Sequence, residues 1–205
     1  MDAERLRMIS LVLKLISILL IIVALGTPWL YLRGTEDTPL LSVGDFTINK
    51  ASINGIGSVS TDIPTSNPSS KLSISISFFS LIGAIQVIAL AVLSLTTYYW
   101  FYLKTSAKRP KREDFERLLI YDLLLSIILM IIPLIVITLY PSFKLHYALY
   151  QRQGETLKLV REDEKILRDL PLVMLGPGSI ISLIAGIILF SSVVLYGYAS
   201  NKDLL

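Results

Sequence analysis

The sequence of 205 residues contains no cysteine and a single histidine, His146. Without cysteine the chain can form no disulfide, thiolate metal site or cysteine nucleophile, and it cannot be lipidated through sulfur. One histidine excludes bis-histidine haem ligation and zinc sites built from several histidines of the chain. His146 lies in a segment of alternating polarity, so we expect it on a strand as a surface or sheet-packing residue rather than as a ligand.

Catalytic motifs are missing as well. The sequence has no P-loop, G-x-G-x-x-G, G-x-S-x-G or H-E-x-x-H pattern, and each of these supplies a specific phosphate cradle, nucleophile or set of metal ligands. We therefore expect a protein that is not an enzyme, with no catalytic residue, no cofactor and no metal site.

Charge is also scarce, since Asp, Glu, Lys and Arg make up 17% of the residues and hydrophobic residues 53%. A soluble domain usually has about 25% charged residues. The deficit falls in four apolar runs, each long enough for a helix that crosses a hydrocarbon core, which takes about 20 residues. These runs predict one membrane domain of four spans. The expected spans are about 9–32, 73–103, 118–140 and 172–199, and the expected external loops are 33–72 and 141–171.

The placement of Lys and Arg predicts the orientation of the spans, because these residues gather on the cytosolic side. Six of them crowd the short link from Lys104 to Arg117, and Arg5 and Arg7 precede the first span. We expect a multi-pass protein of the plasma membrane with both termini in the cytoplasm. The net charge of +3 fits this topology, and we expect no nucleic-acid partner.

Two hairpins are predicted in the external loops. Asn54-Gly55 lies between alternating segments, and both turn positions tolerate positive φ. In the second loop, residues 144–150 and 155–160 alternate on either side of Gln-Arg-Gln-Gly. Because a lone hairpin is marginally stable, we expect both hairpins to merge into one antiparallel sheet. Residues 61–70 are expected to form an irregular connector, and the charged residues 161–170 have helical spacing.

Polar residues inside the spans are the first candidates for function, because charge is costly in lipid. Asp122 is the intramembrane acidic residue. We expect it near a helix N-terminus, paired with Arg117 or Lys104; the alternative is a proton or cation site. Lys14 is expected to snorkel to the interface, and Gln86 to form a hydrogen bond across helices. The candidate packing or interface residues are Trp29, Gly83, Ala84, Gln86, Ser182 and Gly186.

The segment Ala24-Leu-Gly-Thr-Pro-Trp-Leu-Tyr-Leu-Arg-Gly34 resembles the end of the first helix in the claudin superfamily, which includes the peripheral myelin protein and stargazin-type auxiliary subunits. Trp29, with Gly26 and Pro28 as its setting, matches a family position, whereas the G-L-W signature and the cysteine pair of the family are absent. The resemblance implies a claudin-like four-helix membrane bundle with a small extracellular antiparallel β-sheet, without catalysis.

These observations lead to two hypotheses of function. In the first, the chain is a tetraspan protein, surrounded by membrane lipids, that makes lateral or surface contacts through its extracellular sheet with a second copy of itself or with a membrane protein partner. In the second, it is a small accessory or assembly subunit of a multi-subunit respiratory or transport complex. Ion or proton permeation through Asp122 is a third, less favoured reading.

Overall fold

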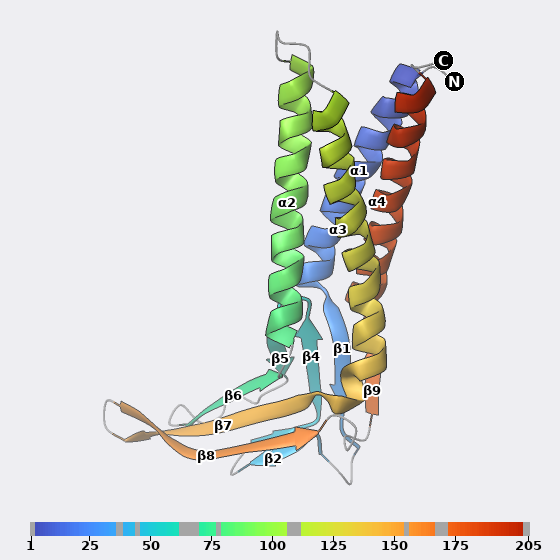
Figure 1. Cartoon of the computed structure of the whole chain (residues 1–205). Helices are drawn as coiled ribbons and strands as arrows, with labels where there is room; N and C mark the ends of the chain where they lie inside the picture. Colours follow the sequence, from blue (N-terminus) through green and yellow to red (C-terminus); the bar gives the residue numbers. More distant parts are fainter. Residues whose placement is uncertain are drawn as a thin grey trace. The chain divides into compact units, whose positions relative to one another are not determined.

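The computed structural model describes residues 3–35, 39–43, 46–61, 70–76, 79–105, 112–153, 156–166 and 172–202. The chain divides into two compact units. The bundle unit contains Met1–Ala24, Ile85–Leu134 and Ile180–Leu205, and the β unit contains Leu25–Ala84 and Ile135–Ser179. Each unit is described by itself, with the elements labelled in Figure 1.

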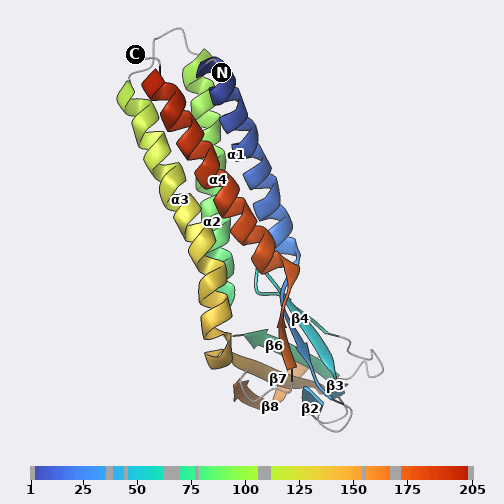
Figure 2. The ribbon, with the colours of Figure 1, turned by 90° about the vertical axis from the view of Figure 1, so that its right-hand side faces the viewer.

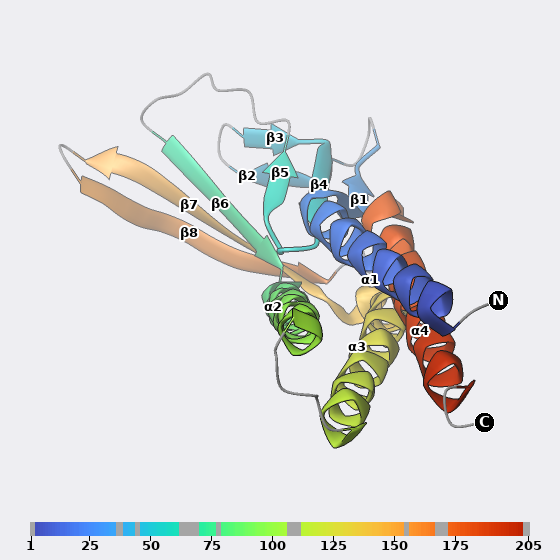
Figure 3. The ribbon, with the colours of Figure 1, turned by 90° about the horizontal axis from the view of Figure 1, so that it is seen from above.

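Four helices dominate the described residues. They are α1 (Ala3–Gly26), α2 (Phe79–Thr105), α3 (Arg112–Leu139) and α4 (Pro177–Lys202). Each helix contains a segment long and apolar enough to cross a membrane. In the bundle unit, the beginning of α1 and the end of α4 lie at the same end (Figure 2), and the view along the helices shows α4 beside both α1 and α3 (Figure 3).

The helices of the bundle unit carry apolar side chains on their outer faces. On α1 the exposed positions include Val12, Leu15 and Leu19, whereas the buried stripe at helical spacing includes the polar residues Ser10, Lys14 and Ser17. A helix on a water-soluble protein has the reverse distribution, with the apolar stripe inside. Polar residues inside and apolar residues outside are the arrangement of helices that face lipid.

The helix boundaries differ from the expected spans, and three of the differences have a clear cause in a proline or a neighbouring strand. α1 ends at Gly26 because Pro28 disfavours helical geometry at the residue before it and offers no N–H group. α2 begins at Phe79 rather than near residue 73, because β6 (Ser70–Ile76) comes before it. α4 begins at Pro177, a residue whose fixed φ suits the first helical position, after β9 (Leu172–Leu175).

The described strands of the β unit form three antiparallel sheets rather than the single sheet expected. The first sheet, sheet A, has the strand order β5-β4-β1-β9. Besides β9, it contains β1 (Pro28–Arg33), β4 (Lys50–Asn54) and β5 (Val59–Thr61). The second pairs β2 (Leu41–Val43) with β3 (Phe46–Ile48). The third, sheet C, has the order β6-β7-β8, with β7 (Lys144–Gln153) and β8 (Thr156–Ile166) after the short 3-10 helix η1 (Tyr140–Ser142).

Both predicted hairpins are confirmed, but the turn of the first is longer than Asn54-Gly55, and its positive φ falls at Gly57. β4 and β5 pair across the turn that follows Asn54, whose side-chain Oδ1 accepts hydrogen bonds from the N–H groups of Ile56 and Ser58 at 3.2 and 2.9 Å. Gly57 has a φ of 88° in this turn, a conformation that L side chains rarely adopt. β7 and β8 form the second hairpin.

Two further expectations on the loops have different outcomes. The helical structure expected from the spacing of residues 161–170 is wrong up to Ile166. β8 continues to that residue and pairs with β7 along its length. Residues 167–170 lie outside the described residues. Most of the expected connector, residues 62–69, also lies outside them.

Candidate functional site: a buried polar cluster in the bundle unit

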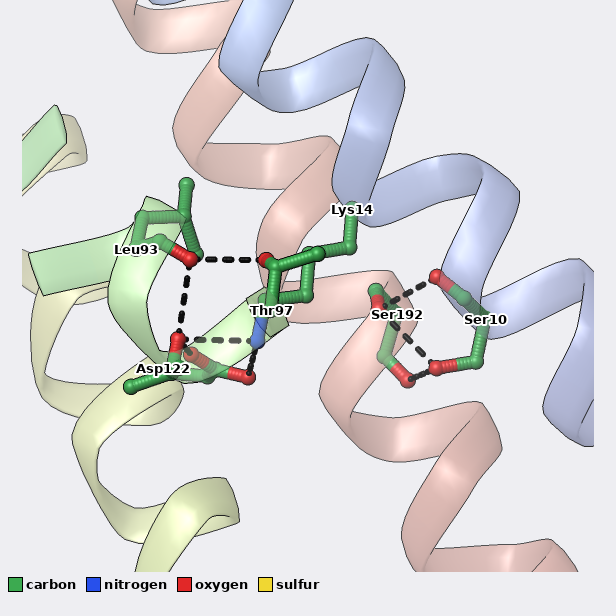
Figure 4. A network of polar contacts seen from close by, with 7 residues as sticks. Ser10, Lys14, Leu93, Thr97, Asp122 and Ser192 are labelled. Atoms are coloured by element: carbon green, nitrogen blue, oxygen red, sulfur yellow. Dashed lines mark hydrogen bonds and ion pairs between the residues drawn. The ribbon is translucent and has the colours of Figure 1, made fainter. Parts of the chain in front are cut away.

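Three helices of the bundle unit meet at a buried ion pair. Lys14 of α1 places its Nζ 2.6 Å from Oδ2 of Asp122 on α3 and donates a second hydrogen bond of 2.9 Å to Oγ1 of Thr96 on α2. Thr96 Oγ1 lies 2.9 Å from the other carboxylate oxygen of Asp122 and 3.0 Å from the carbonyl oxygen of Leu93. The side chains of Lys14 and Asp122 are each 8% exposed. Figure 4 shows the cluster from close by.

The expected surroundings of these two charges were wrong. Asp122 pairs with Lys14 rather than with Arg117, and Lys14 is buried within the bundle instead of reaching the interface; the side chain of Lys104 lies outside the part that the structure describes. Burying a single charge is very costly, whereas a pair with good geometry and further hydrogen bonds recovers most of that cost. The arrangement neutralises both charges locally and ties α1, α2 and α3 together.

Serine residues form a second polar contact, between α1 and α4. Ser10 and Ser192 bond reciprocally: each hydroxyl donates to the main-chain carbonyl of the other residue, at 2.9 and 2.8 Å, and the two hydroxyl oxygens are 3.0 Å apart. Further along α1, the Ser17 hydroxyl donates to the carbonyl oxygen of Ala185 at 2.8 Å. Small residues let the two backbones come close enough for these bonds.

A small cavity of about 20 Å³ lies between the two polar contacts. Ser10, Lys14, Asp122 and Ser192 contribute to its lining, together with the aromatic ring of Tyr196. This volume holds about one water molecule, and the lining offers the polar partners that a buried water needs. The cavity is too small for an organic substrate.

The candidate packing residues of the bundle unit lie in two kinds of surroundings. Gly186 is buried where a Cβ atom would stand 2.7 Å from Cγ of Met130 and 3.0 Å from the carbonyl oxygen of Ser126, so α3 and α4 approach closely there. Gln86 and Ser182 are fully buried, and their side-chain polar atoms have no hydrogen-bond partner in the part of the chain that the structure describes. The expected hydrogen bond of Gln86 across helices is therefore not found.

In the β unit, the candidate packing residue Trp29 is fully buried. The register between β1 and β4 shifts between Pro28 and Leu30, so Trp29 is the extra residue of a β-bulge and its side chain is buried along with that of Leu30. A Cβ atom on Gly178 would stand 2.4 Å from Cδ1 of the indole, and the Gly176 N–H donates to the Trp29 carbonyl oxygen at 2.8 Å. Trp29 thus packs against the beginning of α4.

The other two candidates belong to the first turns of α2. Gly83 is buried against the turn of the β4–β5 hairpin, because a Cβ atom there would stand 2.9 Å from the carbonyl oxygen of Gly55 and from Cα of Ile56. Ala84, the next residue, is exposed. Gly83 therefore allows the close approach of a helix and a turn, and Ala84 takes no part in it.

The β7–β8 hairpin carries charged pairs at its surface. Lys144 donates a hydrogen bond of 2.6 Å to Glu164 and thereby lowers the pKa of that carboxyl group. The backbone N–H of Glu164 lowers the pKa of Asp163, to which the Tyr147 hydroxyl donates a hydrogen bond of 3.1 Å; burial raises the pKa of Tyr147. His146 lies on β7, with Nδ1 3.7 Å from Glu164. Exposed pairs of this kind stabilise a fold little.

The arrangement of the polar cluster suits a structural role better than a chemical one. Each oxygen of its carboxylate has a partner, Lys14 for Oδ2 and Thr96 for Oδ1, and the cavity beside it has no room for the substrate that a general base must reach. The chain matches no protein-family model and no curated protein sequence.

Proposed function

We propose that the chain is a non-enzymatic tetraspan protein of the plasma membrane that makes protein–protein contacts through its β unit, with a second copy of the chain as the partner. Both termini are cytoplasmic and the β unit is extracellular in this proposal. Support for the membrane location comes from the inside-out distribution on α1, where the exposed side chains are apolar and the buried stripe is partly polar.

The observation that carries the proposed contact is the outer strand of sheet C. β8 pairs with β7 on one side, and on its other side it pairs with no strand among the described residues. Leu159, Val160 and Ile166 are at least 43% exposed on this strand. Val160 is the extra residue of a bulge, because Leu149 pairs with Arg161 and Tyr150 with Leu159. An exposed edge strand with apolar side chains is a template for strand addition.

A second copy is the partner that suits this edge best. β8 carries both signs of charge: the acidic run Glu162 to Glu164 lies between Arg161 and Lys165, and Lys158 precedes it on the same strand. In the antiparallel β8–β8 register that sets Val160 opposite its own copy, Lys158 of each strand lies across from Glu162 of the other, and such cross-strand pairs of opposite charge are stabilising.

The segment around Trp29 supports a claudin-like architecture as part of the same proposal. β1 follows α1 after Thr27 alone and pairs with strands from both loops. In the claudin resemblance, the tryptophan leads out of the first helix into the first external strand, and self-association in the membrane plane is a property that the resemblance implies.

Disulfide crosslinking tests the contact directly, because the natural chain has no cysteine and an introduced thiol is the single one present. Val160→Cys on β8 is expected to form a homodimer on mild oxidation in native membranes. Ser42→Cys, an exposed position on β2, serves as the matched control and should stay monomeric. A V160C chain that forms no dimer would refute self-association through β8.

Purification in mild detergent separates the proposal from the accessory-subunit hypothesis. A homo-oligomer should elute without other proteins, whereas an accessory subunit would co-purify with a respiratory or transport core. Permeation through Asp122 is not favoured, because Lys14 neutralises the carboxylate at 2.6 Å, and a cation pathway is lined by acidic groups that the ion can reach.

A further inference from the structure

Sheet A of the β unit has one buried face and one open face. Leu30 and Leu32 of β1 and Ala51 and Ile53 of β4 are buried. Since successive side chains point to opposite faces of a sheet, the residues between them, such as Tyr31, lie on the open face. The register sets two rows across this face. The first row contains Ser60, Ser52, Tyr31 and Met174, and the second contains Lys50, Arg33 and Leu172.

Arg33 and Lys50 are directly opposite one another in the register of β1 and β4. Both are exposed, and in the ranges that the structure describes neither forms an ion pair. Like charges at opposed positions of a sheet repel and destabilise it. An oxyanion bound between them would remove this repulsion, and the guanidinium fork of arginine is matched in shape to phosphate oxygens.

The two cations form a shared wall of two neighbouring clefts. One cleft, of about 320 Å³, is lined by Tyr31, Ser52 and Ser60 as well as Arg33 and Lys50. The second, of about 380 Å³, contains the same two cations and extends past Asn49 to Leu172. Volumes of this order accommodate a small ligand or a headgroup, and the hydroxyl groups of the first cleft add hydrogen-bond donors for its oxygen atoms.

Apolar side chains border the cations. Met174 and Leu172 are 46% and 42% exposed, and Tyr31 is 37% exposed. β1 is separated from α1 by Thr27, and β9 is separated from α4 by Gly176, so both strands are continuous in sequence with helices apolar enough to cross a membrane. Acidic headgroups attract lysine and arginine near a membrane surface, and tyrosine is enriched at the level of the headgroups.

We propose that the open face of sheet A binds the phosphate headgroup of an acidic phospholipid between Arg33 and Lys50. The phosphate oxygens accept hydrogen bonds from the two cations, and Tyr31, Met174 and Leu172 contact the apolar part of the lipid next to the headgroup. The inference depends on insertion of the helices in a membrane, but not on self-association through β8.

Native mass spectrometry of the full chain tests this site. The protein is purified in detergent and mixed with equal amounts of phosphatidylglycerol and phosphatidylcholine. The natural chain should retain phosphatidylglycerol preferentially. Arg33→Gln with Lys50→Gln should weaken this preference about thirty-fold, the expected effect of two lost charge contacts near a lipid surface. Lys144→Gln with Arg152→Gln removes the same charge from exposed positions of β7, outside both clefts and outside β8, and should leave the preference unchanged.

Two outcomes would overturn the proposal. One is an equal preference for phosphatidylglycerol in the R33Q/K50Q variant and in the natural chain. The other is displacement of the lipid by inorganic phosphate at equal concentration, because the site would then belong to a free oxyanion. A thermal melt in detergent shows whether the double variant is folded. If it is not, the single variant Lys50→Gln is measured in its place. V160C crosslinking provides an independent readout of the proposed function.

Discussion

Lys14 and Asp122 show how a membrane-type bundle accommodates charge. Among the described side chains, each is the one buried residue of its sign on its helix, and hydrogen bonds join the two to each other and to Thr96. Replacing a buried ion pair by apolar residues of similar volume is often tolerated, whereas the loss of one partner leaves an uncompensated charge. The pair therefore specifies which helices meet more than it stabilises the bundle.

A double-mutant cycle should reveal this difference. Lys14→Met keeps most of the side-chain volume and leaves Asp122 without its partner, so we expect a loss of about 3–5 kcal/mol in the free energy of unfolding. Asp122→Leu alone should cost a similar amount. The combined variant should be more stable than either single variant, as measured by unfolding in mixed detergent micelles. Strictly additive losses would show that the two charges do not depend on each other.

The sequence does contain a signal for this pair, but it appears only when the depths of the two charges within their helices are compared. Lys14 lies 11 residues after the first residue of α1 and Asp122 lies 10 residues after the first residue of α3, and the first and third spans of a four-span chain run in the same direction. Two lone opposite charges at equal depth predict a pair. No such signal exists for the burial of Trp29, because it depends on a one-residue bulge in the pairing of β1 with β4.

At the scale of elements, α4 contains a matched pair of glycines. A Cβ atom on Gly186 would stand 3.0 Å from the backbone nitrogen of Met130 and from the carbonyl oxygen of Ser126, whereas one on Gly197 would meet no atom within 4 Å. The two positions share the same helix and differ in what packs against them. A close helix contact needs the bare backbone at Gly186 but not at Gly197.

Gly186→Ala and Gly197→Ala should therefore have effects of opposite sign on the temperature of unfolding in detergent. G197A gains helix propensity without a clash and should raise it slightly, since alanine is favoured over glycine by up to about 1 kcal/mol inside a helix. G186A must push α3 and α4 apart and should lower it. Equal effects of the two changes would mean that α3 and α4 do not approach closely at this position.

The sequence predicted the type of most elements correctly, but it predicted less well the residues at which they begin and end. The four apolar runs and both hairpin turns indicated the correct element types, because long hydrophobic segments and Asn-Gly turns are strong local signals. β9, with the sequence Leu-Val-Met-Leu, was assigned to a span because a short apolar strand cannot be distinguished by periodicity from the beginning of an apolar helix. Its pairing with β1 depends on residues about 140 positions away in the chain, as in Leu30 with Leu175.

At the scale of the whole molecule, long-range strand pairing links the two loops of the β unit. β9 from the second loop pairs with β1 from the first, and β6 from the first loop pairs with β7 from the second. If the four helices cross a membrane as proposed, the loops can pair in this way only when both emerge on the same side. The two helices between the loops, α2 and α3, supply the even number of crossings that this requires.

Thiol labelling of intact cells tests this topology, again because the natural chain has no cysteine. Ser58→Cys, an exposed position in the turn after Asn54, should react with a membrane-impermeant maleimide from outside. Ser106→Cys, in the Lys104–Arg117 link, should react only after the membrane is permeabilised, because the positive residues of this link are retained in the cytoplasm. Ile88→Cys, on the exposed apolar surface of α2, should resist the polar reagent under both conditions because lipid surrounds it.

Labelling of S58C and S106C from the same side would contradict both the four-span arrangement and the extracellular assignment of the β unit. Ready labelling of I88C would show that the apolar helix surface faces water.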